Sequence, residues 1–430
     1  MSSSSIMESL RTALSVPELK QRNVVSVNGE MMGSSSSSKH GAIDMVQFLA
    51  TTKPETKDPF FVMDVGVLVK LWEKWVNALP NIHPFYAVKC NPGPAMIAAL
   101  AALGAGFDCA SPAEIDAVLA AGVSPDRIIY ANPCKDEDHV EYSARLGINL
   151  TTIDSVEEVR KLRKCHPKTA ALLRIKVDDS SANVPFGVKY GALLPEEVDG
   201  ILETAVAAGI NVSGVSFHIG TGASHGKAFA SAIASAKLVF DRALQLGLPP
   251  MHVLDLGGGF TAGEQFDDAA ATIASALELH FADDVPDLTL IAEPGRYFAQ
   301  TVFSEATRVI GKRVRGGGIE YWVNDGIYGS MLCIIHEGIT LTASPLACKS
   351  RPENPTCEGM ETYVSTVFGP TCSGLDRVVR HGSRRFDPDD HRGDFGSVSL
   401  LPSVFLQNRR SRSLVSGFGH EGVGVNLREN

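Results

Sequence analysis

The feature that most constrains this chain is a regular alternation of short apolar segments with longer alanine- and leucine-rich segments, from about residue 60 to about residue 300. Short apolar segments bounded by turn residues are typical of buried strands, and the longer ones have helical periodicity. Strands are predicted at 85–89, 106–109, 128–132, 150–154, 171–177, 214–218, 253–256 and 289–292, with helices such as 95–103, 112–121, 155–165, 195–208 and 227–246. Eight such units predict a (β/α)8 barrel, with an open, doubly wound sheet as the alternative.

A barrel would place the chemistry of this chain at one end, because enzymes with this fold carry their active sites at the carboxyl ends of the strands. Charged, imidazole and glycine residues do gather at or directly after the predicted strand ends: Lys89, Asp108, His218, Gly257, Gly258, Gly259, Glu293, Gly295 and Arg296, with Pro294 among them. Arg174 lies within the fifth predicted strand. Taken singly, each has a plain structural explanation, since strand-end lysines commonly cap sheets in solvent and lone histidines are commonly core residues. Together they predict an active site.

These strand-end residues match the needs of one cofactor. A crowded or buried lysine such as Lys89 loses its proton readily and can bind an aldehyde covalently. Glycines after two successive strands, with Thr221 and Arg296, would let backbone N–H groups approach a phosphate. The His218 ring can lie flat on a planar cofactor, and Glu293 beside a pyridine nitrogen would keep that nitrogen protonated. The sequence therefore predicts a pyridoxal phosphate site.

Six ordered motifs resemble those of the ornithine decarboxylases, especially the plant type. They are Pro-Phe-Tyr-Ala-Val-Lys-Cys-Asn from residue 84, Gly-Phe-Asp-Cys-Ala-Ser from 106, Val-Ser-Phe-His-Ile-Gly from 215, Asp-Leu-Gly-Gly-Gly-Phe from 255, Ala-Glu-Pro-Gly-Arg-Tyr from 292 and Phe-Gly-Pro-Thr-Cys from 368. The resemblance covers roughly residues 45–378. It implies an alanine-racemase-type fold: a (β/α)8 barrel over residues 66–300, and a mostly-β domain, barrel or sandwich, from residues 43–65 and 301–430.

The same resemblance implies a function. The chain is expected to decarboxylate ornithine to putrescine in polyamine biosynthesis with pyridoxal phosphate, as a homodimer with shared active sites. Lys89 would bind the cofactor, and Cys372 of the other subunit would protonate the substrate carbon. His218 would stack on the cofactor ring, and Glu293 would pair with the pyridine nitrogen. Thr221, Gly259 and Arg296 would bind the phosphate, and the other expected cofactor-binding residues at these turns are Gly257, Gly258, Pro294 and Gly295. Asp108, Glu114 and Arg174 would support the site.

Three departures from the family pattern concern the substrate and the tail. The family has a Tyr-Asp pair where this chain has His336 and Glu337, and an aspartate where it has Ser373. Loss of a charged hydrogen-bond partner typically costs on the order of 1–3 kcal/mol. Beyond about residue 379 the resemblance stops, and the family's last tyrosine is missing. We expect this tail not to rebuild the last strands of the β domain.

Composition restricts the partners of this chain. A net charge of −10, without a basic run before the tail, argues against nucleic acid and membranes and favours a small amino-acid substrate. The eight cysteines form no CxxC pair, which predicts reduced thiols, no metal site and a cytoplasmic location. Serine runs predict that residues 1–42 form a disordered extension, and a transit peptide is the weaker alternative.

Three functions besides ornithine decarboxylation stay open from the sequence. One is a lysine/ornithine decarboxylase of relaxed specificity that also makes cadaverine, favoured by Ser373 and the His336-Glu337 pair. Another is a catalytically weak, cofactor-binding paralogue, disfavoured by the presence of Lys89 and Cys372. An amino-acid racemase on the same fold is the least favoured, because Cys372 stands where the family has its proton donor.

Overall fold

The computed structural model of this 430-residue chain forms two compact units. One is Leu71–Phe298, and the other combines Met1–Lys70 with Ala299–Asn430. The structure describes residues 3–15, 24–28, 58–177, 187–220, 226–282, 285, 287–316, 318–337, 341–347, 362–385, 397–401, 415–416 and 423–427. None of the helices in these ranges is long and apolar enough to cross a membrane.

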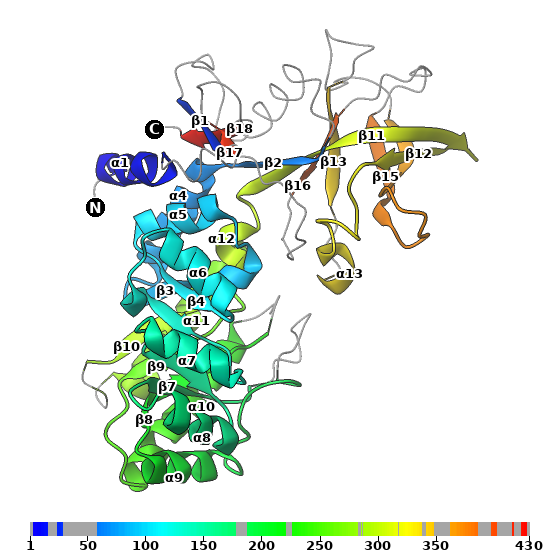
Figure 1. The fold of residues 1–430 in the computed structure, drawn as a ribbon. Helices are drawn as coiled ribbons and strands as arrows, with labels where there is room; N and C mark the ends of the chain where they lie inside the picture. Colours follow the sequence, from blue (N-terminus) through cyan, green and yellow to red (C-terminus); the bar gives the residue numbers. More distant parts are fainter. Residues whose placement is uncertain are drawn as a thin grey trace. The chain divides into compact units, whose positions relative to one another are not determined.

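The first unit is a closed barrel of eight parallel strands in the order β10-β3-β4-β5-β6-β7-β8-β9, coloured cyan to yellow-green in Figure 1. The strands are β3 (Ile82–Ala87), β4 (Gly106–Cys109), β5 (Ile128–Tyr130), β6 (Leu150–Ile153), β7 (Ala170–Arg174), β8 (Asn211–Ser216), β9 (Val253–Asp255) and β10 (Thr289–Ala292). The predicted (β/α)8 barrel is confirmed, and the open-sheet alternative is wrong. Large side chains such as Phe85, Leu172 and Ile291 fill its core.

Helices alternate with these strands: α4 (Val65–Ala78), α5 (Pro94–Leu103), α6 (Pro112–Ala120), α7 (Glu137–Arg145), α8 (Val156–Cys165), α9 (Val198–Ala208), α10 (Lys227–Gln245), α11 (Glu264–Phe281) and α12 (Arg296–Ala299). Their ends follow local chemistry. Ser111 and Ser155 accept hydrogen bonds from backbone N–H groups at the starts of α6 and α8, and Gly104 ends α5 in the left-handed conformation.

Several strands end earlier than predicted, which moves two candidate site residues. β3 stops at Ala87, so Lys89 lies in the 3-10 turn η2 (Val88–Cys90), and β8 stops at Ser216, so His218 lies in the following loop. Directly after η2, Gly93 N–H donates to the Asn91 side chain at 2.9 Å. Both residues therefore sit just beyond the strands that position them.

The second unit is built on a ten-stranded sheet. Its strands are β1 (Val24–Asn28), β2 (Phe60–Met63), β11 (Phe303–Arg315), β12 (Gly318–Val323), β13 (Thr342–Ala347), β14 (Thr362–Phe368), β15 (Arg377–Arg385), β16 (Ser397–Leu401), β17 (Val415–Ser416) and β18 (Val423–Leu427), with helices α1 (Ser3–Leu14) and α13 (Cys333–Glu337). A core around Val309, Tyr321, Val323 and Val367 packs on this sheet.

The structure has regular elements near both ends of the chain, where the sequence predicted disorder and an atypical tail, and for residues outside the described ranges both stay predictions. Residues 1–42 were expected to be disordered, yet α1 is a helix that buries Leu10 and Leu14, and β1 pairs with β18. The tail was expected not to rebuild strands, yet β16 pairs antiparallel with both β11 and β13. The physical reason is pairing between segments far apart in the chain, which local composition does not reveal.

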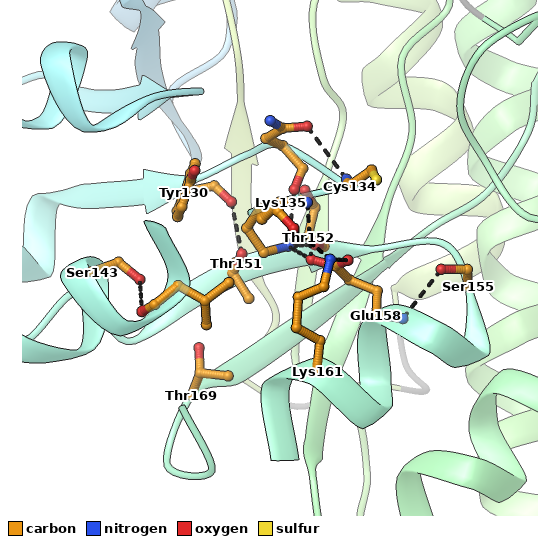
Figure 2. A network of polar contacts seen from close by, with 12 residues as sticks. Tyr130, Cys134, Lys135, Ser143, Thr151, Thr152, Ser155, Glu158, Lys161 and Thr169 are labelled. Atoms are coloured by element: carbon orange, nitrogen blue, oxygen red, sulfur yellow. Dashed lines mark hydrogen bonds and ion pairs between the residues drawn. The ribbon is translucent and has the colours of Figure 1, made fainter. Parts of the chain in front are cut away.

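A buried ion pair fastens the loop after β5 to helix α8 (Figure 2). The side chains of Lys135 and Glu158 are 1% and 2% exposed, and their charged atoms lie 2.8 Å apart. Lys135 Nζ also donates to the carbonyls of Asn132 and Thr152, at 2.9 and 2.8 Å. Lys161 Nζ lies 2.7 Å from the second Glu158 oxygen. Every ammonium hydrogen of Lys135 thus has an acceptor, which a buried charge requires.

This network predicts unequal effects of two adjacent substitutions. Glu158→Ala leaves the Lys135 ammonium buried without its carboxylate and should lower the free energy of unfolding by about 3–5 kcal/mol. Glu157→Ala is the matched control, because the Glu157 side chain is 78% exposed and should change that free energy by less than about 0.5 kcal/mol. Denaturant unfolding followed by circular dichroism measures both, and equal effects would contradict this account.

Candidate active site

Lys89 and Asp108 form the centre of the candidate site at the carboxyl end of the barrel. Lys89 Nζ lies 2.5 Å from Asp108 Oδ2, and the Lys89 side chain is 48% exposed while that of Asp108 is fully buried. Burial disfavours the charged amine, but the carboxylates of Asp108, Glu293 and Glu114 outweigh this effect and raise the pKa of Lys89. Asp108 Oδ1 has no hydrogen-bond partner in the described part of the chain. The amine is therefore oriented, charged and accessible.

Two predicted supporting residues flank this pair. Glu114, in the first turn of α6, accepts a hydrogen bond from Ala110 N–H at 2.7 Å, and burial raises the pKa of its carboxyl. Arg174 ends β7 with its guanidinium 5.4 Å from the centre of the Tyr190 ring. Arg174 also lowers the pKa of His218 and opposes the rise in the pKa of Glu293, so it lies among the site groups.

A second group of acids lies deeper at the strand ends. Glu293 follows β10 and is 7% exposed, and Asp255 ends β9 and is fully buried. Burial first, and then the charge of Asp255, raises the pKa of Glu293 well above its ordinary range. Burial likewise raises the pKa of Asp255, although Gly257 N–H donates to its Oδ1 at 2.9 Å. Burial and the neighbouring acid thus favour the protonated form of Glu293.

Asp255 is a site residue that the sequence analysis did not select. Its position at the carboxyl end of a barrel strand, directly before the glycines, was a usable indication. The register Arg174↔Ser216↔Asp255 across β7, β8 and β9 places these three residues in one layer. Asp255 Oδ2 and Ser216 Oγ are both buried without a hydrogen-bond partner among the described residues.

His218 is held as a neutral imidazole. Gly220 N–H donates to its Nδ1 at 3.0 Å, so the ring hydrogen of the neutral form is on Nε2. Burial, and then the positive charges of Arg174 and Lys89, lower the pKa of His218 well below its ordinary range. A neutral aromatic ring at this place suits stacking on a planar cofactor.

The three glycines after β9 occupy space that no side chain could share. A Cβ on Gly257 would lie 1.9 Å from the Phe217 carbonyl oxygen, and one on Gly258 would lie 2.6 Å from His218 Nε2. Gly259 has a φ of +112°, which side chains rarely adopt. These turns therefore bring the backbone close to His218 without a Cβ in the way, which suits a phosphate cradle. Thr221, the predicted hydroxyl ligand, lies outside the described residues.

Glycine also allows the β10 loop to approach the Lys89 turn. A Cβ on Gly295 would lie 2.9 Å from Cys90 Cβ and 3.2 Å from Ala87 Cβ, and Ala87 N–H donates to the Pro294 carbonyl. Arg296 starts α12 directly afterwards. The barrel thus brings together the candidate residues of the strand ends, from Lys89 through Glu293 to Arg296.

The remaining candidates lie in the other compact unit. Cys372 and Ser373 belong to the loop between β14 and β15, where the Cys372 side chain is exposed and Ser373 Oγ lies 2.9 Å from the Tyr328 hydroxyl. His336 and Glu337 end the short helix α13. Buried Asp376 holds the loop, because its carboxylate accepts hydrogen bonds from Thr371 and Ile327 N–H.

The residues present fit pyridoxal phosphate. An accessible lysine amine suits the aldehyde, a buried glutamate with a raised pKa suits the ring nitrogen, and the glycine turns after β9 suit the phosphate. This fold and this set of groups together define a pyridoxal phosphate-dependent barrel protein.

The comparison with known proteins narrows this class. Residues 65–300 match the family described as pyridoxal-dependent decarboxylase, pyridoxal binding domain. The chain belongs to this family of pyridoxal-dependent decarboxylases.

Relatives and solved structures agree with this assignment. The chain is 55% identical to the chloroplastic ornithine decarboxylase of Nicotiana glauca over 78% of this chain and 77% of that protein. It is 40% identical to ornithine decarboxylase of Rattus norvegicus over 86% of this chain and 80% of the relative. The arginine decarboxylase of Paramecium bursaria Chlorella virus, solved with agmatine, aligns with a TM-score of 0.78 at 32% identity, over 85% and 95% of the two chains. These relatives do not favour the racemase, the weak paralogue or the relaxed-specificity enzyme.

The glycine turn yields a prediction about cofactor binding. Gly258→Ala places a methyl group against the His218 ring and should weaken pyridoxal phosphate binding about 5- to 150-fold, the effect of 1–3 kcal/mol of overpacking. Gly200→Ala on α9, where a new Cβ meets nothing within 4 Å, should leave binding unchanged. Titration of cofactor-free protein followed by cofactor absorbance measures both affinities. Equal affinities for Gly258→Ala and the unmodified chain would argue against a cradle at this turn.

Proposed function

We propose that this chain decarboxylates ornithine to putrescine with pyridoxal phosphate, a step of polyamine biosynthesis. The observation that carries the proposal is the accessible Lys89 amine, paired with buried Asp108 at the carboxyl end of the barrel. Identity of 55% to an ornithine decarboxylase supports the choice of substrate.

The barrel residues would bind and orient the cofactor. When bound, pyridoxal phosphate supplies an electron sink for the carbon that loses carbon dioxide. Lys89 Nζ would bind its aldehyde, and Asp108 would keep that amine in place. Buried Glu293 would share its proton with the ring nitrogen, while neutral His218 covers the ring face.

The phosphate would be held by the glycine turn and its neighbours. Backbone N–H groups of Gly258 and Gly259, with Thr221 and Arg296, would surround it, and Gly257, whose own N–H donates to Asp255, would supply the close turn. Pro294 and Gly295 would let the β10 loop pass close to Lys89. Glu114 and Arg174 would fix the positions of Asp108 and His218. These residues also exclude water from the ring nitrogen, since Glu293 and Asp255 are buried.

Cys372 is the proposed proton donor to the substrate carbon after carbon dioxide leaves. Its thiol is exposed on a loop that Asp376 fixes by hydrogen bonds, so it can be presented to a second chain. We propose a homodimer in which Cys372 of one subunit serves Lys89 of the other. Glu337 and His336 would then meet the distal amine of a small amino acid, beside the uncharged Ser373.

The first experiment is carbon dioxide release by the purified chain with pyridoxal phosphate, from ornithine and from lysine. Release from ornithine that disappears in Lys89→Ala is the expected result. A folded, cofactor-loaded chain that releases no carbon dioxide from either substrate would overturn the decarboxylase proposal.

Shared active sites predict complementation between two inactive variants. Cys372→Ala should lower kcat by about 10²–10⁴-fold, the range for loss of a general acid. When the Cys372→Ala and Lys89→Ala chains are dissociated, mixed and reassociated, the mixture should reach roughly a quarter of the activity of the unmodified chain. Half of the dimers are then mixed, and each mixed dimer has one intact site out of two. A mixture of Cys372→Ala with the unmodified chain controls for exchange. Mixed dimers without recovered activity would show that each site uses one subunit.

The compartment is part of the same proposal. The sequence predicts the cytoplasm, whereas the Nicotiana glauca relative is named chloroplastic. A fluorescent fusion at the carboxyl terminus, imaged against a plastid marker, distinguishes the two locations.

A further inference from the structure

The second compact unit contains a fully buried glutamate in the middle of a strand. Glu305 lies on β11 and is 0% exposed, with Phe61 of β2 in register on one side and Leu400 of β16 on the other. Both neighbours in register are apolar. The charged group that faces Glu305 is another acid, Asp325, from the turn that follows β12. A buried carboxylate beside a carboxylate is costly unless one of the two binds a proton.

Hydrogen-bond counting assigns that proton to Glu305. Ser330 Oγ lies 2.7 Å from Asp325 Oδ2 and 3.2 Å from each Glu305 oxygen. A serine hydroxyl has one hydrogen, so it cannot donate to both carboxyl groups. Asp325 also accepts hydrogen bonds from Gly326 N–H at 2.7 Å and Ser330 N–H at 3.1 Å, which favour its ionised form. Glu305 is therefore the neutral acid, donating its own hydrogen.

The turn held by this acid pair carries the support of the Cys372 loop. Asp325 and Ser330 are the two ends of the turn, and Ile327 and Tyr328 lie between them. Ile327 N–H donates to Asp376 at 3.0 Å, and the same carboxylate accepts from Thr371 N–H at 3.0 Å and from its hydroxyl at 2.6 Å.

Tyr328 provides a second link. Its hydroxyl is 2.9 Å from Ser373 Oγ, directly after Cys372. The turn therefore contacts the Cys372 loop at Ser373 and at Asp376, and Asp376 in turn holds Thr371, directly before the thiol.

We propose that Glu305 is a positioning residue for Cys372, and that it acts only while it shares its proton with the Asp325–Ser330 turn. This inference rests on the proposed function in one respect, namely that Cys372 is the proton donor. Ionisation of Glu305 would put two negative charges against one hydroxyl, which releases the turn and loosens the loop that presents Cys372.

The electrostatics agree in direction. Burial, and then the charge of Asp325, raises the pKa of Glu305 well above its ordinary range. A carboxyl whose pKa is raised in the folded protein makes its full contribution to stability at pH values below the ordinary glutamate pKa of about 4.3. That stability is lost as pH rises towards the raised pKa. Within this window the equilibrium for opening the turn should increase by up to about tenfold per pH unit.

Alkylation of Cys372 by iodoacetamide, measured by peptide mass spectrometry between pH 5 and pH 8, tests this inference without an activity assay. Exposed Cys134 in the barrel is the internal reference. Its alkylation rate corrects for the general effect of pH on thiolate formation and for the reagent concentration. In the unmodified chain the rate ratio of Cys372 to Cys134 should rise with pH more steeply than in Glu305→Gln, whose amide cannot ionise. Glu320→Gln, which removes a carboxylate of β12 paired with Arg313, is the matched control and should follow the unmodified chain.

A second variant keeps the inference testable if Glu305→Gln does not fold. Asp325→Asn removes the neighbouring charge, so Glu305 should ionise closer to its ordinary range and the ratio should stop rising at a lower pH. Identical pH profiles for the unmodified chain and either variant would overturn the inference. Because thiol reactivity is read directly, a chain without decarboxylase activity would refute the proposed function and leave this result interpretable.

Discussion

The structure of the candidate site depends on the burial of more acids than cations at one end of the barrel. Asp108, Asp255 and Glu293 are all nearly inaccessible to water, and Lys89 and Arg174 are the cations that affect them. Two charges cannot neutralise three carboxylates, so burial keeps at least one proton among the acids. Lys89 pairs with Asp108 at 2.5 Å, which leaves the proton to Glu293 and Asp255. A buried carboxyl that can pass its proton to a pyridine nitrogen would suit the cofactor chemistry.

Close backbone approach is the second requirement, and it limits which residues can occupy the strand ends. Gly257 and Gly258 bring the β9 loop against Phe217 and His218, and Gly295 brings the β10 loop against Cys90. Neither approach is compatible with a Cβ. The acids and the phosphate cradle are therefore consequences of one geometry, in which loops from adjacent strands converge above a filled barrel. Substitution in the cradle would also move the ring of His218.

The sequence predicted most of this barrel, for a physical reason, and the structure brings many of the candidate site residues together at one end of it. Strands such as β4 and β10 are short apolar runs between helices, and their boundaries were predicted correctly. Asp255 was missed because the importance of a buried acid depends on its neighbours in space, here Glu293 and the layer formed by Arg174 and Ser216.

The same limit applies at the chain ends. β1 and β16 pair with strands hundreds or tens of residues away, and their local composition does not record those partners. Pairing with a distant strand can thus stabilise a strand that amino-acid propensity alone predicts only weakly. In the barrel, by contrast, each strand pairs with one separated from it by a single helix, apart from the pair that closes the barrel.

Both compact units contain a buried carboxyl that is kept neutral by an adjacent acid, but the consequences differ. In the barrel, Lys89 and Arg174 oppose the rise in the pKa of Glu293, so two positive charges moderate the effect of ionisation. In the β unit, the described groups that shift the pKa of Glu305 are Asp325 and Ser330, and neither is a cation. Rising pH destabilises both arrangements in the same direction. The unit without a compensating cation should lose its order first, and it is the unit that carries Cys372.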